Sequence, residues 1–446
     1  MLAPIVLAAT LAASPARAQS AGGGTRLTLI RDAETETLLR NFANPLFRAA
    51  GVDPNLVRII LIRDNAINSF VSTGNILFVH TGLIMKAESA LELVGVLAHE
   101  TGHIAGGHLA KLPEALREMM ISSIAAMLIG AAAGAMTRGA GAGAAIGAQQ
   151  LAQRNFLSFT RGMERSADQA ALVFLDANKW SAQGMLDLFR HLEGQELLAR
   201  AQQDPYVMTH PVTRERIEFV QNHIATDPFS KSPLPPSFEP AFLMVRAKLQ
   251  AFLTPSSVTL RGVPESDTTL PARYARAIAH FRLGHLAEAL VLIDGLLAAE
   301  PANPWLNELK GQMLFENGKV RESLAPYRTA VRVAPEQPQI RIALAHAMVE
   351  TGDPLLLRLA IQELQVAMDR ERDNAEGWHA LGIAWGKLGD TAQANLALAE
   401  EAMVNGEIAT ARQFAARAEK GLPPGPARLR ATDISNAVKK ENRTGF

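Results

Sequence analysis

The sequence predicts an α+β fold in two parts, a mainly helical domain with a small β-sheet followed by an all-α solenoid of repeats. From about Thr25 to Thr226, extended stretches rich in Ile, Leu and Val, such as Leu56 to Ile62, mix with helix-like stretches. The next segment, 227–240, contains five prolines and is typical of a linker. Beyond the linker, almost all of the chain up to Gly421 has a helical pattern.

An internal repeat organises the C-terminal half. Glycines recur at intervals of 34, 34 and 37 residues, at Gly284, Gly318, Gly352 and Gly389. Small residues stand seven positions before each of them, at Ala277, Gly311, Ala345 and Gly382. A 34-residue helix-turn-helix unit with small residues where its helices meet resembles the tetratricopeptide repeat. A plain helical bundle is the alternative, but a bundle does not require a fixed period.

Domain boundaries follow from these patterns. We expect an export signal at 1–18, a first domain at 25–226, a linker with a connecting helix at 227–270, the repeat array at 271–421 and a tail at 422–446. Stacked helix pairs form a concave surface suited to other proteins. The array therefore predicts that the chain binds a protein partner.

Charge and cysteine content exclude several classes of function. Lys and Arg number 44, and so do Asp and Glu, so the net charge is zero. A neutral balance does not favour nucleic acid as a partner. The chain has no cysteine, which excludes disulfides, a thiolate metal site and a cysteine nucleophile. Any bound metal must be held by histidine and carboxylate side chains.

The chemistry is concentrated in the segment from His99 to His103, which reads His-Glu-Thr-Gly-His. Residues 91–109 have the composition of a buried helix, and histidines four residues apart on a helix lie on one face, within about 40°. Both imidazoles can therefore bind one ion. Glu100 stands beside the first, where it can accept a proton from water as a general base. Two imidazoles and a carboxylate leave a fourth position open, which suits zinc.

A third protein ligand is required, and two segments offer one. His108 stands one residue before the position used in the metzincin pattern, and on a continuing helix it would point about 140° away from His103. We therefore expect His108 at the surface or behind a ligand. Glu164 and Asp168 are four residues apart, so a second helix can direct Glu164 at the metal and Asp168 at a ligand histidine. The alternative is a solvated acidic face.

These motifs resemble a family of zinc peptidases that contains the prenyl-protein protease and the heat-shock membrane protease HtpX. That family combines His-Glu-x-x-His with a distant Glu-x-x-x-Asp. More closely, the chain is similar to periplasmic bacterial members with a C-terminal tetratricopeptide array, and the likeness covers nearly the whole mature chain. The resemblance implies a zincin-type fold with one Zn²⁺ per chain, held by His99, His103 and Glu164. It also implies Glu100 as the general base and Asp168 as a support.

Two further segments resemble the same family. Asn65 to Val79 corresponds to a hairpin whose edge strand pairs with an extended substrate, because backbone hydrogen bonds tolerate many sequences. Its turn, Ser72-Thr73-Gly74, departs from the Pro-Gly-Gly-like turn that is usual there. His210 corresponds to a histidine that either stabilises the developing oxyanion or blocks the metal site until substrate arrives. An ordinary hairpin and a loop histidine are the alternatives.

Two apolar segments bear on location. Leu2 to Ala13, followed by Ala16-Arg17-Ala18, has the pattern of an export signal cut before Gln19, which predicts a bacterial periplasmic location. The alternative is an apolar anchor that stays attached. Residues 119–136 carry no charge and are long enough for a membrane span. Their Ala and Gly content favours instead a helical hairpin or loop over the active site, with peripheral membrane contact as a further expectation.

Together, the motifs and the resemblance predict a zinc-dependent endopeptidase of the bacterial periplasm. Its expected substrates are unfolded, misfolded or stalled outer-membrane proteins, whose assembly it also assists, and the array is expected to recruit the β-barrel assembly machinery. Two other classes stay open: a chaperone-like binding module with rare proteolysis, and a metal-binding structural protein without turnover. The intact His99, Glu100 and His103 argue against the last class.

Overall fold

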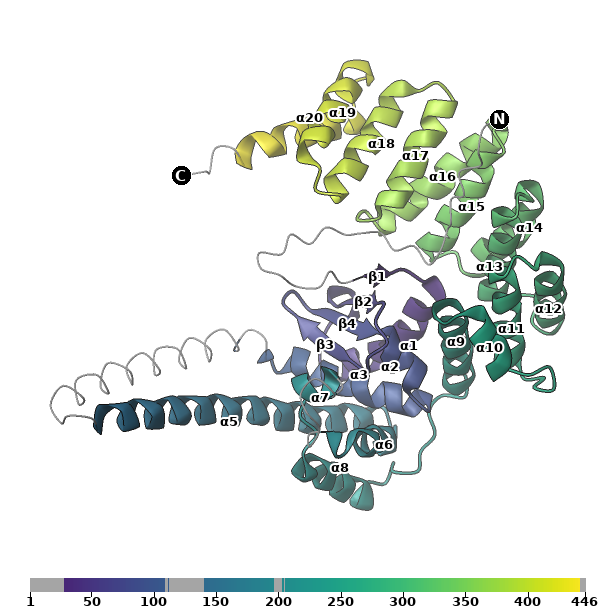
Figure 1. The fold of residues 1–446 in the computed structure, drawn as a ribbon. Coiled ribbons are helices and arrows are strands. Elements are labelled where there is room, and N and C mark those ends of the chain that lie inside the picture. The colour runs from purple at the N-terminus through teal and green to yellow at the C-terminus, as the bar shows by residue number, and fades with distance from the viewer. Residues whose placement is uncertain (1–27, 109–110, 112–139, 196–202, 204, 442–446) are drawn as a thin grey trace. The chain divides into compact units, whose positions relative to one another are not determined.

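The computed structural model describes residues 28–108, 111, 140–195, 203 and 205–441 (Figure 1). The expected export signal at 1–18 and the apolar segment 119–136 lie outside these residues. The chain divides into two compact units, one built mainly from Thr35–Leu249 and the other mainly from Gln250–Phe446. Each unit is described by itself.

The first unit contains a small mixed β-sheet. Its strands are β1 (Leu29–Ile30), β2 (Arg58–Ile62), β3 (Ser69–Ser72) and β4 (Ile76–His80). Their order is β1-β2-β4-β3, in which β2 runs parallel to β4 and the other two pairs are antiparallel. The outer side of β3 pairs with no other strand among the described residues. β3 is therefore an edge strand.

A tight hairpin joins β3 to β4. Phe70 pairs with Phe78 across it, and the two rings stack with their centroids 5.0 Å apart. At the turn, Gly74 and Asn75 have φ angles of 80° and 56°. Glycine and asparagine adopt this left-handed backbone at lower cost than other residues. The turn therefore needs no proline, although its sequence differs from the Pro-Gly-Gly-like form.

The helices of this part of the chain include α3, which carries the His-Glu-Thr-Gly-His motif. They are α1 (Ala33–Ala49), α2 (Thr81–Lys86), α3 (Ala90–Ala105), α5 (Ala140–Ala177), α6 (Gln183–Leu192), α7 (Pro205–Thr209), α8 (Arg214–Thr226) and α9 (Phe238–Leu253). α3 packs against α5, α6 and β3, and its Leu93, Val94 and Leu97 are fully buried. Among the described residues, we find no helix with both the length and the apolar character that crossing a membrane requires.

Local signals define both ends of α3. The Ser89 hydroxyl accepts a hydrogen bond from the Glu92 N–H, and the Glu92 carboxylate accepts one from the Glu88 N–H. This arrangement resembles a capping box, which starts a helix, except that Glu92 accepts from the residue before the N-cap Ser89. At the other end the helix stops at Ala105, and Gly107 has a φ of 58°. The chain therefore leaves the helical path soon after the metal-binding motif.

Two glycines allow α3 to approach its neighbours closely. A Cβ atom on Gly102 would lie 2.6 Å from the carbonyl oxygen of Ala167 on α5. A Cβ atom on Gly95 would lie 2.7 Å from the backbone nitrogen of Met185 on α6. Neither position admits a side chain unless the helices move apart. The close contact at Gly102 brings the C-terminal half of α5 against the motif.

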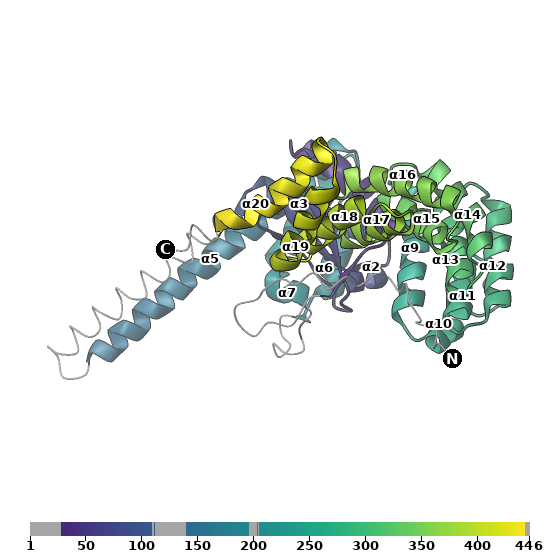
Figure 2. The ribbon, with the colours of Figure 1, turned by 90° about the horizontal axis from the view of Figure 1, so that it is seen from above.

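The second unit is a series of helices stacked in sequence order (Figures 1 and 2). They are α10 (Ser256–Gly262), α11 (Leu270–Arg282), α12 (Leu286–Ala299), α13 (Pro304–Glu316), α14 (Val320–Val333), α15 (Pro338–Glu350), α16 (Pro354–Arg370), α17 (Ala375–Lys387), α18 (Thr391–Val404), α19 (Ile408–Gly421) and α20 (Pro426–Glu441). Each helix packs against the next. The prediction of an all-α repeat region after the first domain is confirmed.

The periodic residues have the positions that the repeat requires. The turn glycines all have positive φ angles, of 80°, 77°, 67° and 84° at Gly284, Gly318, Gly352 and Gly389. Ala277 and Ala345 are fully buried, and a Cβ atom on Gly311 would lie 2.6 Å from the ring of Tyr327. Small residues therefore lie where paired helices meet.

The C-terminal segment 422–446 differs from the expected tail, because most of it forms α20. α20 packs against α18 and α19. Its Ala431 and Ile434 are 0% and 1% exposed, among alanines of those two helices. Burial of this apolar face stabilises the helix. Two such side chains are too few to form a clear period in the sequence.

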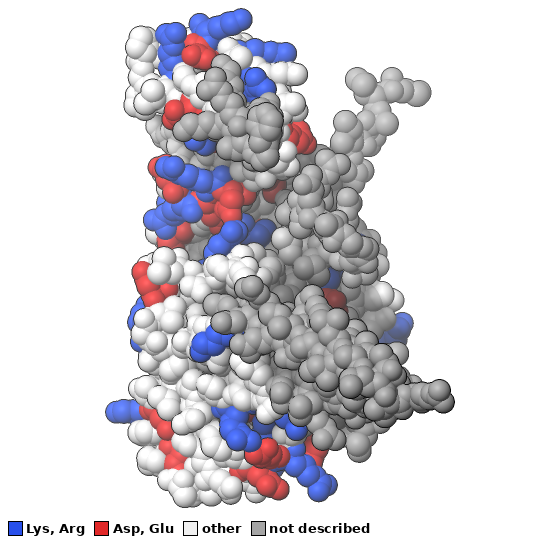
Figure 3. Space-filling view, turned by 90° about the vertical axis from the view of Figure 1, so that its left-hand side faces the viewer, with Lys and Arg blue, Asp and Glu red and all other residues white. Residues whose placement is uncertain are grey.

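Figure 3 shows Lys and Arg side chains lying among Asp and Glu side chains over the described part of one face. Both signs number 44 in the sequence. The view agrees with the neutral balance, which does not favour nucleic acid as a partner.

Candidate metal centre

Two histidines of α3 form the base of the site. His99 and His103 are four residues apart, so they lie on one face of the helix. Their Nε2 atoms are 3.1 Å apart, and the side chains are 0% and 9% exposed. Two imidazole nitrogens thus point to one buried position, as the sequence predicts.

Glu164 joins them from α5. Its Oε2 lies 3.3 Å from His99 Nε2, and its Oε1 lies 3.4 Å from His103 Nε2. Ligand atoms about 2.0–2.1 Å from a tetrahedral ion are separated by about 3.3–3.4 Å. The three side chains therefore fit a zinc-sized ion without rearrangement.

Glu100 has the environment of a group that acts on a water molecule. It is fully buried, and neither of its carboxylate oxygens has a hydrogen-bond partner among the described residues. His210 lies beside it, with its Nε2 3.5 Å from Glu100 Oε1. Burial raises the pKa of Glu100 above its ordinary value. Buried acceptors are normally satisfied, so this carboxylate is in place for a water beside the ion.

Asp168 orients the first histidine from the opposite side. Its Oδ1 lies 2.9 Å from His99 Nδ1. Burial by itself lowers the pKa of His99, but hydrogen bonds to Asp168 and Glu164 outweigh burial and raise that pKa to about 9. A proton on Nδ1 donates to Asp168 and leaves the lone pair on Nε2 for the metal. Binding of a cation at Nε2 therefore competes with binding of a second proton there.

His210 completes the cluster from the segment after α7. Its Nδ1 lies 3.3 Å from His99 Nε2 and 3.2 Å from both carboxylate oxygens of Glu164. The side chain is 8% exposed. One atom from each of His99, His103, Glu164 and His210 lies within 4.8 Å of the others. His210 is thus close enough to act as a fourth ligand.

Comparison with known proteins identifies the domain that contains this cluster. Residues 32–224 match peptidase family M48. The domain belongs to that family. The chain is also 24% identical to the beta-barrel assembly-enhancing protease of Yersinia pestis over 387 residues, which are 84% of this chain and 78% of the relative. The protein of the same name from Escherichia coli (strain K12) is 24% identical over 394 residues, 84% of this chain and 77% of the relative.

Membership of the M48 family makes the protein a metallopeptidase. The M48 domain extends from α1 into α8, so it contains the whole cluster. The structure brings together all six of the residues that the sequence singled out. They are His99, Glu100, His103, Glu164, Asp168 and His210.

Arg216 of α8 is a residue of the M48 domain that the sequence did not reveal. Its Nε and Nη2 donate to Asp168 Oδ2 and Oδ1 at 2.6 and 2.8 Å, and its Nη1 lies 3.1 Å from Glu164 Oε2. Burial raises the pKa of Asp168, but Arg216 outweighs burial and holds that pKa below its ordinary value. Arg216 therefore keeps Asp168 ionised. Nothing in its spacing distinguishes it from Arg214, which is exposed.

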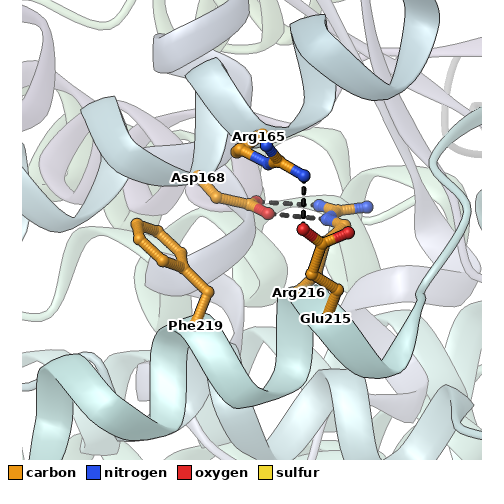
Figure 4. Close-up of a pocket in the computed structure, with 5 residues that line it drawn as sticks. All are labelled: Arg165, Asp168, Glu215, Arg216 and Phe219. Atoms are coloured by element: carbon orange, nitrogen blue, oxygen red, sulfur yellow. Dashed lines mark hydrogen bonds and ion pairs between the residues drawn. The ribbon is translucent and has the colours of Figure 1, made fainter. Parts of the chain in front are cut away.

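A cavity of about 230 Å³ lies behind the Asp168–Arg216 pair (Figure 4). Its lining includes a second ion pair, between Arg165 and Glu215, whose side chains are 62% and 71% exposed. Phe219 completes the lining. The buried pair and the exposed pair thus lie side by side between α5 and α8 of the M48 domain, as Figure 4 shows.

His108 of the M48 domain is buried behind a ligand. The sequence predicts the direction of His108 from a continuing helix. α3 instead ends at Ala105, and Gly107 has a positive φ. His108 is 5% exposed, and its Nδ1 lies 3.0 Å from His103 Nδ1. It is therefore in contact with the ring nitrogen of His103 that faces away from Glu164. Of the two expected places, the one behind a ligand is the one observed.

Proposed function

We propose that this protein is a zinc-dependent endopeptidase of the bacterial periplasm that cleaves misfolded or stalled outer-membrane proteins and assists their assembly. The observation that carries the proposal is the convergence of two imidazoles and the Glu164 carboxylate beside a buried Glu100 without a hydrogen-bond partner among the described residues. The name of the relatives, beta-barrel assembly-enhancing protease, supports the substrate class. The export pattern at 1–18 supports the location.

The roles of the side chains follow from their positions. His99, His103 and Glu164 would hold the ion, and zinc supplies a Lewis acid that activates water and polarises the scissile carbonyl. Glu100 accepts a proton from the attacking water and donates it to the leaving amine. Burial raises the pKa of Glu100, which makes its carboxylate a stronger acceptor for that proton. Asp168 holds His99 in the tautomer that binds metal.

Metal removal tests the proposal as a whole. Dialysis against a chelator is expected to abolish cleavage of casein, and added Zn²⁺ is expected to restore it, because the activated water depends on the ion. Casein cleavage is measured together with the zinc content of the same samples. Full activity in protein shown to be free of metal would rule out the proposed chemistry.

We propose that His210 blocks the site until substrate arrives. Its imidazole touches His99 and Glu164, so it occupies space beside the ligands that a substrate carbonyl needs. Replacing His210 by Ala is expected to raise kcat/KM for casein, by about tenfold if the contact contributes about 1.4 kcal/mol to the blocked form. A decrease of kcat/KM would instead assign His210 to stabilisation of the oxyanion.

We propose that substrate binds as an added strand along β3. The His80 N–H donates to Asn68 O at 3.0 Å, so these residues form a hydrogen-bonded pair. Pairs alternate in an antiparallel ladder, and the backbone groups of Val71 therefore face away from β4. A peptide on that side would gain main-chain hydrogen bonds whatever its sequence.

Val71→Pro tests this arrangement, because proline removes the outward N–H donor. Loss of one such hydrogen bond, at about 0.5–1.5 kcal/mol, is expected to lower kcat/KM for casein about two- to tenfold. Val71→Ala is the matched control, since it also loses side-chain volume but keeps the N–H. Equal activities of the two variants, at equal zinc content, would contradict strand addition.

We also propose that the repeat array recruits the β-barrel assembly machinery, since stacked helices α11 to α20 provide an extended surface for a protein partner. The alternative is a chaperone-like module in which binding by the array dominates and proteolysis is rare. The Glu100→Gln variant separates the two. A cell that needs only binding is complemented by this variant, and a cell that needs cleavage is not.

A further inference from the structure

A second cluster of metal-ligand side chains lies between α5 and α8, outside the peptidase site. Asp176 stands near the C-terminal end of α5, His223 is in the last turn of α8, and Asp227 follows that helix directly. His223 Nε2 lies 3.1 Å from Asp176 Oδ1. One carboxylate oxygen of Asp227 lies within 4.8 Å of a ligand atom of each of the other two residues.

Asp227 gives an independent sign that this cluster holds a cation. Asp227 is only 7% exposed. One oxygen, Oδ1, accepts a hydrogen bond from the Phe229 N–H at 2.9 Å. The other, Oδ2, is buried and has no hydrogen-bond partner among the described residues. A buried carboxylate oxygen without a partner lowers the stability of the folded state, and a bound cation removes this loss of stability.

We propose that Asp176, His223 and Asp227 bind a second zinc ion. One imidazole and two carboxylates are ligands that zinc accepts, and the separation of 3.1 Å between His223 Nε2 and Asp176 Oδ1 is close to the value of about 3.3 Å for two ligands of one tetrahedral ion. The side chains of Asp176 and His223 are 35% and 24% exposed. The ion can therefore enter from solvent and keep a water as its fourth ligand.

This ion joins the two helices that position the peptidase site. Asp176 follows Asp168 by eight residues on α5, and His223 follows Arg216 by seven residues on α8. At about 1.5 Å per residue, each new ligand is about 10–12 Å along its helix from the Asp168–Arg216 contact. The second zinc thus holds α5 and α8 together at a distance from the first, where it contacts no substrate. Its role is structural.

Metal content measures the proposal directly. The untagged full chain is loaded with zinc sulfate, desalted and analysed for zinc per chain. Wild-type protein is expected to retain two ions and Asp227→Asn one, because Asn can keep the hydrogen bond to the Phe229 N–H but loses the charge. His379→Gln is the matched control. His379 lies 3.0 Å from Glu401, outside both clusters, so its loss is expected to leave the zinc content unchanged.

A variant with His99→Gln and His103→Gln separates the two sites. It is expected to retain one ion and to show a higher Tm when zinc is added, because a ligand that binds only the native state stabilises it. Adding Asp227→Asn is expected to remove both the ion and the shift in Tm. If Asp227→Asn does not fold, Asp176→Asn, at a partly exposed position, replaces it. Equal zinc content with and without Asp227→Asn or Asp176→Asn would overturn the second site. A change in zinc content caused only by His99→Gln and His103→Gln would concern the proposed peptidase metal alone.

Discussion

Replacing Glu100 by Gln is expected to lower kcat/KM for an unfolded protein about 10²- to 10⁴-fold, the range associated with loss of a general base. The amide has nearly the same shape but cannot accept the proton from the attacking water. Zinc content should stay unchanged, because Glu100 is separate from the cluster of ligand atoms formed by His99, His103, Glu164 and His210. The measurement is casein cleavage together with metal analysis of the same preparation.

Glu88→Gln is the control for this change, since Glu88 is exposed and precedes the same helix. It should cleave casein at the rate of the wild type. If Glu100→Gln also did so, the assignment of the base would be wrong. If it lost cleavage and still complemented a deletion strain, the chemistry would be correct but the cellular role would be that of the binding module.

Replacing Arg216 by Met is expected to lower the free energy of unfolding by about 3–5 kcal/mol, the cost of removing one partner of a buried ion pair. Arg216 is 7% exposed and Asp168 is fully buried, so the carboxylate left behind loses its cationic partner at a buried position. Arg216 also donates to the carbonyl of Pro211 at 2.8 Å and lies over the ring of Phe189. Urea denaturation of metal-free protein measures the loss without a contribution from the ion.

The neighbouring ion pair provides a control of the same chemical type. Arg165 pairs with Glu215 on the rim of the same cavity, but its side chain is 62% exposed. Arg165→Met should therefore change stability by only about 0–1 kcal/mol. Combining Arg216→Met with Asp168→Asn should recover part of the loss, because no buried charge is then left unpaired. A loss below 1 kcal/mol for Arg216→Met alone would show that Asp168 finds another partner.

The sequence predicts the parts of the site that depend on spacing within one helix. His99 and His103, and likewise Glu164 and Asp168, are four residues apart, and that interval fixes a common face whatever the rest of the fold does. The glycine turns, at intervals of 34, 34 and 37 residues, are local in the same sense. Such features can be predicted because they depend only on the geometry of a helix, which the local sequence determines.

The parts that stay hidden depend on contacts between distant segments. Arg216 reaches Asp168 across 48 residues, and its sequence neighbours give no sign that it is the buried arginine. The sequence predicts the direction of His108 from a continuing helix, but that helix ends three residues earlier, at Ala105. The second zinc site likewise joins Asp176 to His223 across 47 residues. In each case the partner is chosen by how α3, α5 and α8 pack.

Gly102 has a consequence for metal affinity. It stands between the two histidines, and its missing side chain lets the carbonyl of Ala167 approach. The separation of α3 from α5 sets how far Glu164 stands from His99 and His103. Gly102 therefore determines the distances between the metal ligands although it does not contact the ion. One added methyl group at Gly102 would move Glu164 away from His99 and His103.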